Sequence, residues 1–219
     1  MELRHEVKHV ITYGEMLTLE RRLETVMAPD CHYKDGVYRI RSLYFDDEDD
    51  TALYEKLDGV SPRSKFRIRF YNGDTSYVVL EKKSKISGLC KKEQLRIGES
   101  EARSLAKGDL PATLPDHGIL RDLAFEMSRR GLAPKTCVEY ERRAFVFFAG
   151  GVRVTIDRDI GSSFDTDAFF DSPLFIPVEG RILEVKWNEF LPDTVRDAVA
   201  LGSCMSSAFS KYAACRVFG

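Results

Sequence analysis

The sequence lacks three features that would place it in common classes of protein. Its five cysteines contain no CxxC pair and are scattered, at Cys31, Cys90, Cys137, Cys204 and Cys215. This odd set argues against a disulfide framework and against a cysteine-based zinc site. No apolar run approaches the ~20 residues that span a membrane, and charges occupy the N-terminus where a signal peptide would be apolar. We therefore predict a reduced, soluble, cytoplasmic protein with no membrane segment of its own.

The bulk composition is that of an ordinary globular chain. Of 219 residues, 43% are hydrophobic and 31% are charged, and the net charge is -2. This length suits one well-packed domain better than two, so we predict a single domain over residues 1–219. The small net charge by itself does not indicate a partner. The placement of the charges is more informative, because basic residues recur inside strand-like segments.

Short runs of alternating apolar and polar residues dominate the chain and predict antiparallel strands. The predicted strands are Leu3–Thr12, Val37–Phe45, Ser64–Tyr71, Ser76–Lys83, Lys91–Ile97, Thr136–Phe148, Val152–Ile156 and Arg181–Trp187. Helical spacing predicts helices over Gly14–Met27, Ser100–Lys107, Ile119–Arg130 and Asp193–Arg216. The acidic run Asp46–Asp50 is expected to be a solvated loop in which Asp46 caps the segment after it. The pattern predicts an α+β fold whose sheet closes on itself.

Several of these strands place ionisable residues on one face and apolar residues on the other. Arg67 and Arg69, for example, alternate with Phe66, Ile68 and Phe70. The same alternation groups Arg4, Glu6 and Lys8; Glu81 and Lys83; Tyr140 and Arg142; Arg153, Thr155 and Asp157; and Glu184 and Lys186.

A single amphipathic strand usually points its charged face at water. Repetition over at least six strands, with cations in excess, favours instead a closed barrel whose lumen holds a polyanion. The interspersed carboxylates suit a divalent metal. No aromatic platform accompanies the basic residues, so we do not expect nucleic acid to bind.

Seven motifs, in order along the chain, resemble the VTC domain, the polyphosphate polymerase branch of the triphosphate tunnel (CYTH-like) superfamily. They are RHEVKH, SLYFDD, KFRIRF, LEKKS, VEYERRAF, VRVTIDRDI and LEVKWNEFLP. The resemblance implies a closed eight-stranded antiparallel β-tunnel with flanking helices and a C-terminal helix. It also implies transfer of the γ-phosphoryl of ATP to a growing polyphosphate chain, with Mn²⁺ or Mg²⁺ as cofactor and a membrane partner on a separate chain. No Walker-type GxxxxGK[ST] loop is present to cradle phosphates.

The resemblance also implies roles for individual residues. Arg67 and Arg69 would clamp the phosphates, and the catalytic residues implied are Arg67, Arg69, Arg142 and Arg153. The phosphate-binding residues implied are Lys8, Lys56, Lys83, Lys91, Tyr140, Lys186 and Lys211. Lys91 is preferred over the adjoining Lys92, although the sequence leaves the register open. Glu184 would bind the metal, and Asp157 is either a second metal ligand or a turn-stabilising acid.

Two residues depart from the pattern of related tunnel enzymes. Tunnel hydrolases carry ExExK near the N-terminus, whereas here Arg4 replaces the first glutamate. The loss of one carboxylate weakens the case for metal-activated water and favours transfer over hydrolysis. Ala208 stands where the final helix of the family often has a basic residue. A metal-dependent triphosphate or polyphosphate hydrolase and a non-catalytic polyphosphate-binding module remain the alternatives.

Overall fold

The computed structural model describes residues 4–30, 36–86, 89–110, 113, 118–201 and 209–218. These residues form an α+β structure with one antiparallel sheet. Its strands are β1 (His5–Ile11), β2 (Ala28–Pro29), β3 (Val37–Asp46), β4 (Arg63–Tyr71), β5 (Asp74–Ile86), β6 (Leu89–Ile97), β7 (Ala133–Phe147), β8 (Val152–Ser163), β9 (Ile176–Pro177) and β10 (Arg181–Trp187). Its helices are α1 (Tyr13–Val26), α2 (Thr51–Leu57), α3 (Glu99–Ala106), α4 (Ile119–Arg130), α5 (Asp193–Val199) and α6 (Lys211–Phe218), with a 3₁₀ turn at Ala149–Gly151.

The hydrogen-bonded order of the strands is β1-β10-β8-β7-β3-β4-β5-β6, with β2 beside β7 and β9 beside β8. Within the part of the chain that the structure describes, no hydrogen-bonded pairing joins β1 to β6, so this order has two ends. The closed eight-stranded tunnel is therefore not confirmed. Alternation of charged and apolar residues determines which face of a strand is buried, but it does not determine whether the first and last strands pair.

The chain divides into two compact units. The first comprises Met1–Arg39, Tyr140–Ile160 and Glu179–Ser210, and the second comprises Ile40–Glu139, Gly161–Val178 and Lys211–Gly219. Strands β3, β7 and β8 contribute residues to both units. The prediction of a single domain stays a prediction.

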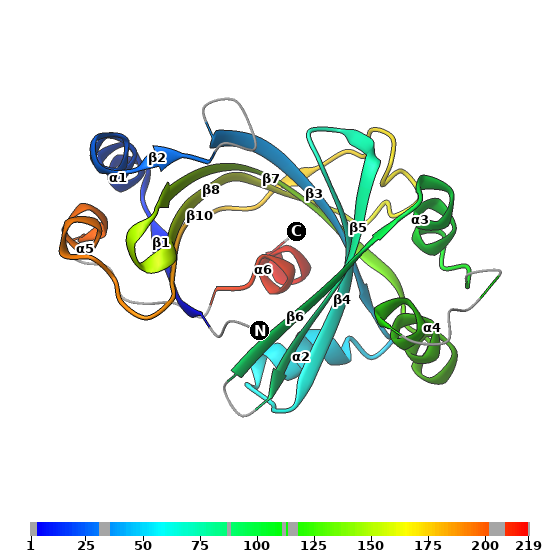
Figure 1. Cartoon of the computed structure of the whole chain (residues 1–219). Coiled ribbons are helices and arrows are strands. Elements are labelled where there is room, and N and C mark those ends of the chain that lie inside the picture. The colour runs from blue at the N-terminus through cyan, green and yellow to red at the C-terminus, as the bar shows by residue number, and fades with distance from the viewer. Residues whose placement is uncertain are drawn as a thin grey trace. The chain divides into compact units, whose positions relative to one another are not determined.

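In the first unit, helices α1 and α5 pack beside each other (Figure 1). Thr12 begins α1 with a capping box, because its hydroxyl accepts a bond from the Glu15 amide and the Glu15 carboxylate accepts one from the Thr12 amide. The apolar stripe Met16, Leu19 and Leu23 then packs against Val154 and Leu183 of the sheet in one hydrophobic core.

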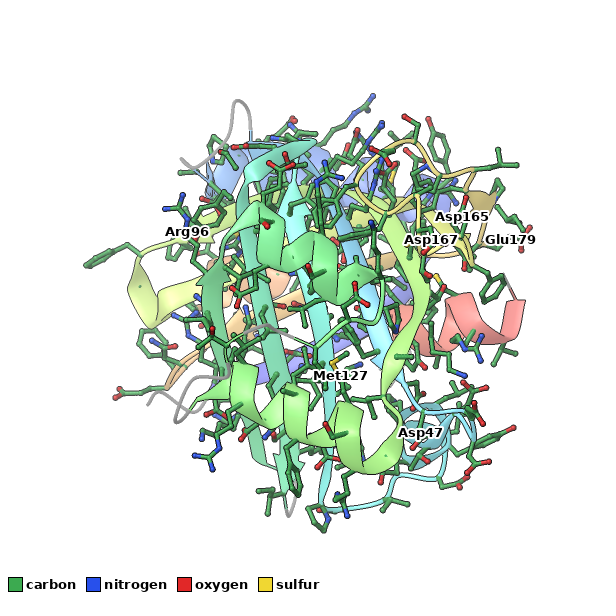
Figure 2. The ribbon with its side chains drawn as sticks, turned by 90° about the vertical axis from the view of Figure 1, so that its right-hand side faces the viewer. Asp47, Arg96, Met127, Asp165, Asp167 and Glu179 are labelled. Carbon is green, nitrogen blue, oxygen red and sulfur yellow. The ribbon has the colours of Figure 1, made fainter. Side chains whose placement is uncertain are left out.

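In the second unit, α3 and α4 cover one face of strands β4, β5 and β6 (Figure 2). The core between them includes Phe66, Ile68 and Phe70 of β4 and Leu123 of α4, all at most 2% exposed. The apolar face of β4 is therefore buried under helices, as the alternation predicts, and its charged face points the other way.

The predicted helix over Asp193–Arg216 is wrong as a continuous element. Helix α5 ends at Val199 because Ala200 is extended (φ -65°, ψ 123°), and α6 begins only at Lys211. Ala208 lies outside the described residues. Helix α2 has no counterpart among the predicted elements, since its seven residues are too short for a clear helical period.

Candidate phosphate-binding site

The charged face of the second unit is formed by β3 to β6, and we call it the arginine face. We define it as Ser42, Tyr44, Lys65, Arg67, Arg69, Glu81, Lys83 and Lys92. The register places Tyr44, Arg67 and Glu81 in one row across three strands. A second row contains Lys65, Lys83 and Lys92. The structure thus brings predicted residues from β4 and β5 together on one surface.

Glu81 lies at the centre of the arginine face and is only 2% exposed. Its Oε2 atom accepts from Arg67 Nε at 2.5 Å and lies 3.9 Å from Arg69 Nη1, while its Oε1 atom lies 2.6 Å from Lys92 Nζ. Burial raises the pKa of Glu81, but Arg67, Arg69 and Lys92 outweigh burial and hold the pKa well below its ordinary value. The carboxylate is therefore charged across the physiological range.

Tyr44 lies among the cations of this face, and its pKa is affected by them. Its hydroxyl oxygen accepts a bond from Arg67 Nη1 at 2.9 Å, and Lys65 and Arg67 each lie 5.7 Å from the centre of its ring. Burial raises the pKa of Tyr44, yet Arg67, Lys65 and Arg69 outweigh it and lower the pKa to about 8. The sequence interpretation missed Tyr44, although the motif SLYFDD contains it.

The register also distinguishes the two adjoining lysines of β6. Lys92 pairs across the sheet with Lys83 and contacts Glu81, so it belongs to the arginine face. Lys91 points to the opposite face, where its Nζ lies 2.9 Å from Glu93 Oε1. Lys92, and not Lys91, therefore lies on the arginine face, because neighbouring residues in a strand face opposite sides.

Lys56 and Lys211 belong to the helices of the same unit. Lys56 lies in the last turn of α2, and Lys211 is the first residue of α6. Helix α6 is held by Tyr212, whose hydroxyl donates to Asp46 Oδ2 at 2.5 Å and whose ring stacks on Tyr44 at 5.0 Å.

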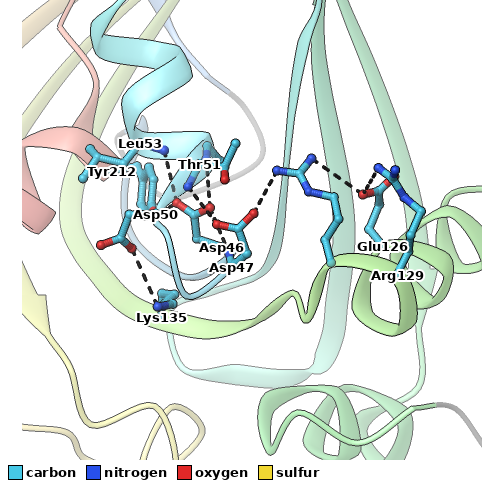
Figure 3. A network of polar contacts seen from close by, with 11 residues as sticks. Asp46, Asp47, Asp50, Thr51, Leu53, Glu126, Arg129, Lys135 and Tyr212 are labelled. Atoms are coloured by element: carbon cyan, nitrogen blue, oxygen red, sulfur yellow. Dashed lines mark hydrogen bonds and ion pairs between the residues drawn. The ribbon is translucent and has the colours of Figure 1, made fainter.

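Asp46 also accepts from the amides of Ala52 and Leu53, so the expectation that it caps the segment after it is confirmed (Figure 3). This contact explains why Asp46 is buried, with no exposed surface, although the acidic run was expected to be a solvated loop.

The first unit holds a second charged cluster, which we call the charge quartet. It consists of Glu6 and Lys8 of β1 and Glu184 and Lys186 of β10. Lys8 Nζ lies 3.0 Å from Glu6 and 3.2 Å from Glu184, and Lys186 Nζ lies 3.4 Å from Glu6 and 2.7 Å from Glu184. Burial raises the pKa of Glu184, but Lys186, Lys8 and Arg142 together lower it well below its ordinary value.

The predicted residues Arg142 and Arg153 are also paired in this unit. Arg142 donates to both oxygens of the buried Asp157, at 2.6 and 2.8 Å, and its guanidinium lies 5.4 Å from the Tyr140 ring centre. Arg153 Nη2 contacts Asp30 at 2.7 Å and donates to the Tyr38 hydroxyl at 2.8 Å. Asp157 is therefore an ion-pair partner, and neither Asp30 nor Tyr38 was identified from the sequence.

The balance of charge differs between the two clusters. The arginine face as defined contains five cations, Lys65, Arg67, Arg69, Lys83 and Lys92, against the one carboxylate of Glu81. The four cations named in the first unit, Lys8, Arg142, Arg153 and Lys186, contact the four carboxylates Glu6, Asp30, Asp157 and Glu184. A surplus of positive charge therefore exists on the arginine face and suits an anion of several charges.

The carboxylates of the first unit offer few ligands to a metal. Among the described residues, no group of three or more His, Cys, Asp or Glu side chains could hold a metal ion. Glu184 and Glu6, which share two lysines, can supply the one or two carboxylates that Mg²⁺ takes when substrate phosphates and water provide its other ligands. These carboxylates suit a metal ion that is coordinated partly by the phosphates of a substrate. They are too few to coordinate a metal ion with protein ligands alone.

Comparison with known proteins places the chain in a family. The VTC domain matches residues 3–218. A search of curated proteins gave no match. Among solved structures, a putative adenylate cyclase from Bacillus halodurans is similar in fold, with a TM-score of 0.51 and 17% identity over 85% of this chain and 80% of that one.

A chain of the Mediator head module of Schizosaccharomyces pombe has a TM-score of 0.48 and 11% identity, over 89% of this chain and 88% of that chain. No helix among the described residues is long and apolar enough to cross a membrane. The match over nearly the whole length shows that this chain belongs to the VTC domain family.

Proposed function

We propose that this protein is a polyphosphate polymerase that transfers the γ-phosphoryl group of ATP to a growing polyphosphate chain. Membership of the VTC domain family supports a function that involves polyphosphate or triphosphate. The observation that carries the proposal is the surplus of cations on the arginine face, where Arg67, Arg69 and Lys92 surround the single carboxylate of Glu81. A phosphate chain would neutralise this surplus.

The chemistry that such a surface performs is mainly positioning and charge stabilisation. In phosphoryl transfer the negative charge spreads over the equatorial oxygens, so that guanidinium and ammonium groups facing them lower the barrier. Arg67 and Arg69 are suited to this because a planar guanidinium can bind two phosphate oxygens at once. We assign catalytic roles to them and to Arg142 and Arg153, and phosphate-binding roles to Lys8, Lys56, Lys83, Lys92, Tyr140, Lys186 and Lys211.

A divalent cation, Mn²⁺ or Mg²⁺, would neutralise phosphate oxygens when bound, and Glu184 with Glu6 would hold it. Arg4 favours transfer over hydrolysis. Its Nε donates to Asn188 Oδ1 at 2.7 Å, so a cation stands directly before β1, at the sequence position where tunnel hydrolases have a first glutamate. Fewer carboxylates leave less support for a metal-bound water as the nucleophile, and the terminal phosphate of the polymer is then the acceptor.

The test is to incubate the purified protein with ATP and Mn²⁺ and to follow polyphosphate and ADP together. Each transfer releases one ADP, so we expect one ADP for each phosphate residue that is added to the polymer. Arg67→Gln should lower kcat/KM by about 100-fold, because one transition-state contact is lost. The control is Arg103→Gln on α3, which removes an exposed arginine that pairs with Glu99 outside the arginine face.

Two other results would contradict the proposal. Release of free phosphate without polymer would identify a hydrolase. Tight binding of tripolyphosphate with no turnover would identify a binding module. Loss of activity in Glu184→Ala, with the protein still folded, would support the assignment of Glu184 to the metal.

A further inference from the structure

Glu81 occupies the place on the arginine face where an anion would be expected. It reaches three cations from two neighbouring strands, Arg67 and Arg69 of β4 and Lys92 of β6. Both of its carboxylate oxygens are used, since Oε2 contacts the arginines and Oε1 contacts the lysine. The side chain is only 3% exposed, so these contacts are poorly screened by solvent.

These contacts use an edge of the Arg67 guanidinium to which a phosphate could also bind. Arg67 Nε and Nη2 both lie 2.5 Å from Glu81 Oε2, and its Nη1 donates to Tyr44. A guanidinium has five N–H donors in a fixed plane. A phosphate that binds the Nε and Nη2 edge of Arg67 through two parallel bonds must therefore share or displace the bonds to Glu81, and a phosphate that binds elsewhere on this guanidinium still approaches a buried negative charge.

We propose that Glu81 is an internal counter-ion that competes with the phosphate chain for Arg67 and Lys92, and so limits how tightly the chain is held. Glu81 orders the cations while no phosphate is present. Its charge then repels the bound chain, which allows the chain to move and leave. Glu81 is a positioning residue, because it acts through Arg67, Arg69 and Lys92. This inference rests on the proposed function only for phosphate binding and not for polymerisation.

The test is the affinity of Glu81→Gln for inorganic tripolyphosphate, measured by calorimetry without ATP or metal. Glutamine keeps the size of the side chain and an acceptor oxygen but removes the charge. We expect binding to become about tenfold tighter, because one like charge beside the ligand is lost. If Glu81 only held the arginines in place, Glu81→Gln should bind tripolyphosphate more weakly than the wild type, since less ordered arginines would bind phosphate less tightly.

The matched control is Glu139→Gln in the same unit. Glu139 pairs with Arg41 at 2.8 Å, away from the arginine face, and its removal should leave the affinity for tripolyphosphate unchanged. Glu81→Asp should stay close to wild type, because it keeps the charge. In the polymerase assay, Glu81→Gln should lower the KM for polyphosphate and lower kcat as well, since the product leaves more slowly.

The outcomes of the binding experiment distinguish failure of the counter-ion proposal from failure of the proposed function. Tighter binding by Glu81→Gln supports the counter-ion, even if the wild type binds too weakly to detect and polymerisation fails. Equal or weaker binding by Glu81→Gln overturns the counter-ion and leaves the proposed function standing. If neither protein binds tripolyphosphate, both proposals fall.

A measurement on the wild type, with Arg67→Lys used only for assignment, covers the case in which Glu81→Gln does not fold. The Nε–H resonance of Arg67, assigned by its loss in Arg67→Lys, reports the bond to Glu81 in NMR spectra. Tripolyphosphate should shift this resonance as the bond is shared or displaced. A resonance that stays unchanged in saturated protein would overturn the proposal.

Discussion

At the scale of single residues, Tyr44 connects the arginine face with helix α6. Its hydroxyl accepts a bond from Arg67, and its ring stacks on Tyr212. The charged or titratable groups near it include Arg67, Lys65 and Arg69 of β4 and Tyr212 of α6. The three cations explain why the pKa of Tyr44 is lowered in spite of its burial.

The ionisation of Tyr44 can be measured directly. We expect one tyrosine to ionise with a pKa of about 8 in an absorbance titration, and this step should be missing in Tyr44→Phe. Since the folded-state pKa lies below the ordinary value of about 10, the wild type should gain stability over Tyr44→Phe as the pH rises from 8 towards 10. Saturating tripolyphosphate should raise the pKa, because it adds negative charge nearby. A titration in which no tyrosine ionises below pH 9 would contradict this assignment.

At the scale of elements, helix α6 is attached to its unit through polar contacts as well as buried apolar side chains. Tyr212 donates to Asp46, and Arg216 Nη2 lies 2.5 Å from Asp50. Asp46 at the same time accepts from the first amides of α2, so a single buried carboxylate holds two helices (Figure 3). Burial raises the pKa of Tyr212, and its bond to Asp46 raises it further, so Tyr212 stays protonated and remains a donor.

The Tyr212 contact predicts a large effect from the loss of one oxygen atom. Tyr212→Phe should reduce the free energy of unfolding by about 1–3 kcal/mol, because a buried carboxylate oxygen loses one of its two donors. Chemical denaturation at pH 7 measures this. Arg129→Gln on α4 is the comparison, since Arg129 forms an exposed pair with Glu126 and should cost less than about 0.5 kcal/mol. Equal effects of the two variants would show that the buried bond contributes little.

At the scale of the whole molecule, the small net charge conceals an uneven distribution. The chain has 33 basic and 35 acidic residues, yet the arginine face holds five cations and one carboxylate. Glu81 and Glu184 are both buried beside cations, and both have pKa values below their ordinary range. Their ionisation therefore stabilises the fold at neutral pH.

This distribution predicts how stability depends on acid. For carboxyls with lowered pKa, the stabilisation is complete above the unfolded-state pKa of about 4.3 and is lost as the pH falls below it towards the folded-state values. The free energy of unfolding, measured with urea from pH 7 to pH 3, should therefore fall steeply below pH 4.5. The slope should be smaller in Glu81→Gln and Glu184→Gln. Unchanged slopes in both variants would show that other carboxyls dominate acid unfolding.

The sequence by itself determined most of the elements and their faces. Alternation in Phe66–Phe70 predicted which side of β4 is buried, and the structure confirms this because apolar side chains must leave water whatever the rest of the fold does. The strand Arg181–Trp187 and the helix Ile119–Arg130 have the predicted bounds. The residues implied by the family motifs lie mostly on charged faces, in two clusters.

Only the tertiary structure decided the register and the partners. Whether Lys91 or Lys92 lies on the same face of the sheet as Arg67 depends on how β6 pairs with β5. A shift of this register by one residue would reverse the answer. Asp46 was expected in a solvated loop, but it is buried, and it accepts a bond from Tyr212, which lies 166 positions later in the sequence. The alternation placed Glu81 on the same face of its strand as Lys83. The importance of Glu81 comes from Arg67 and Lys92 on the neighbouring strands, because electrostatic interactions depend on distance in space and not on distance along the chain.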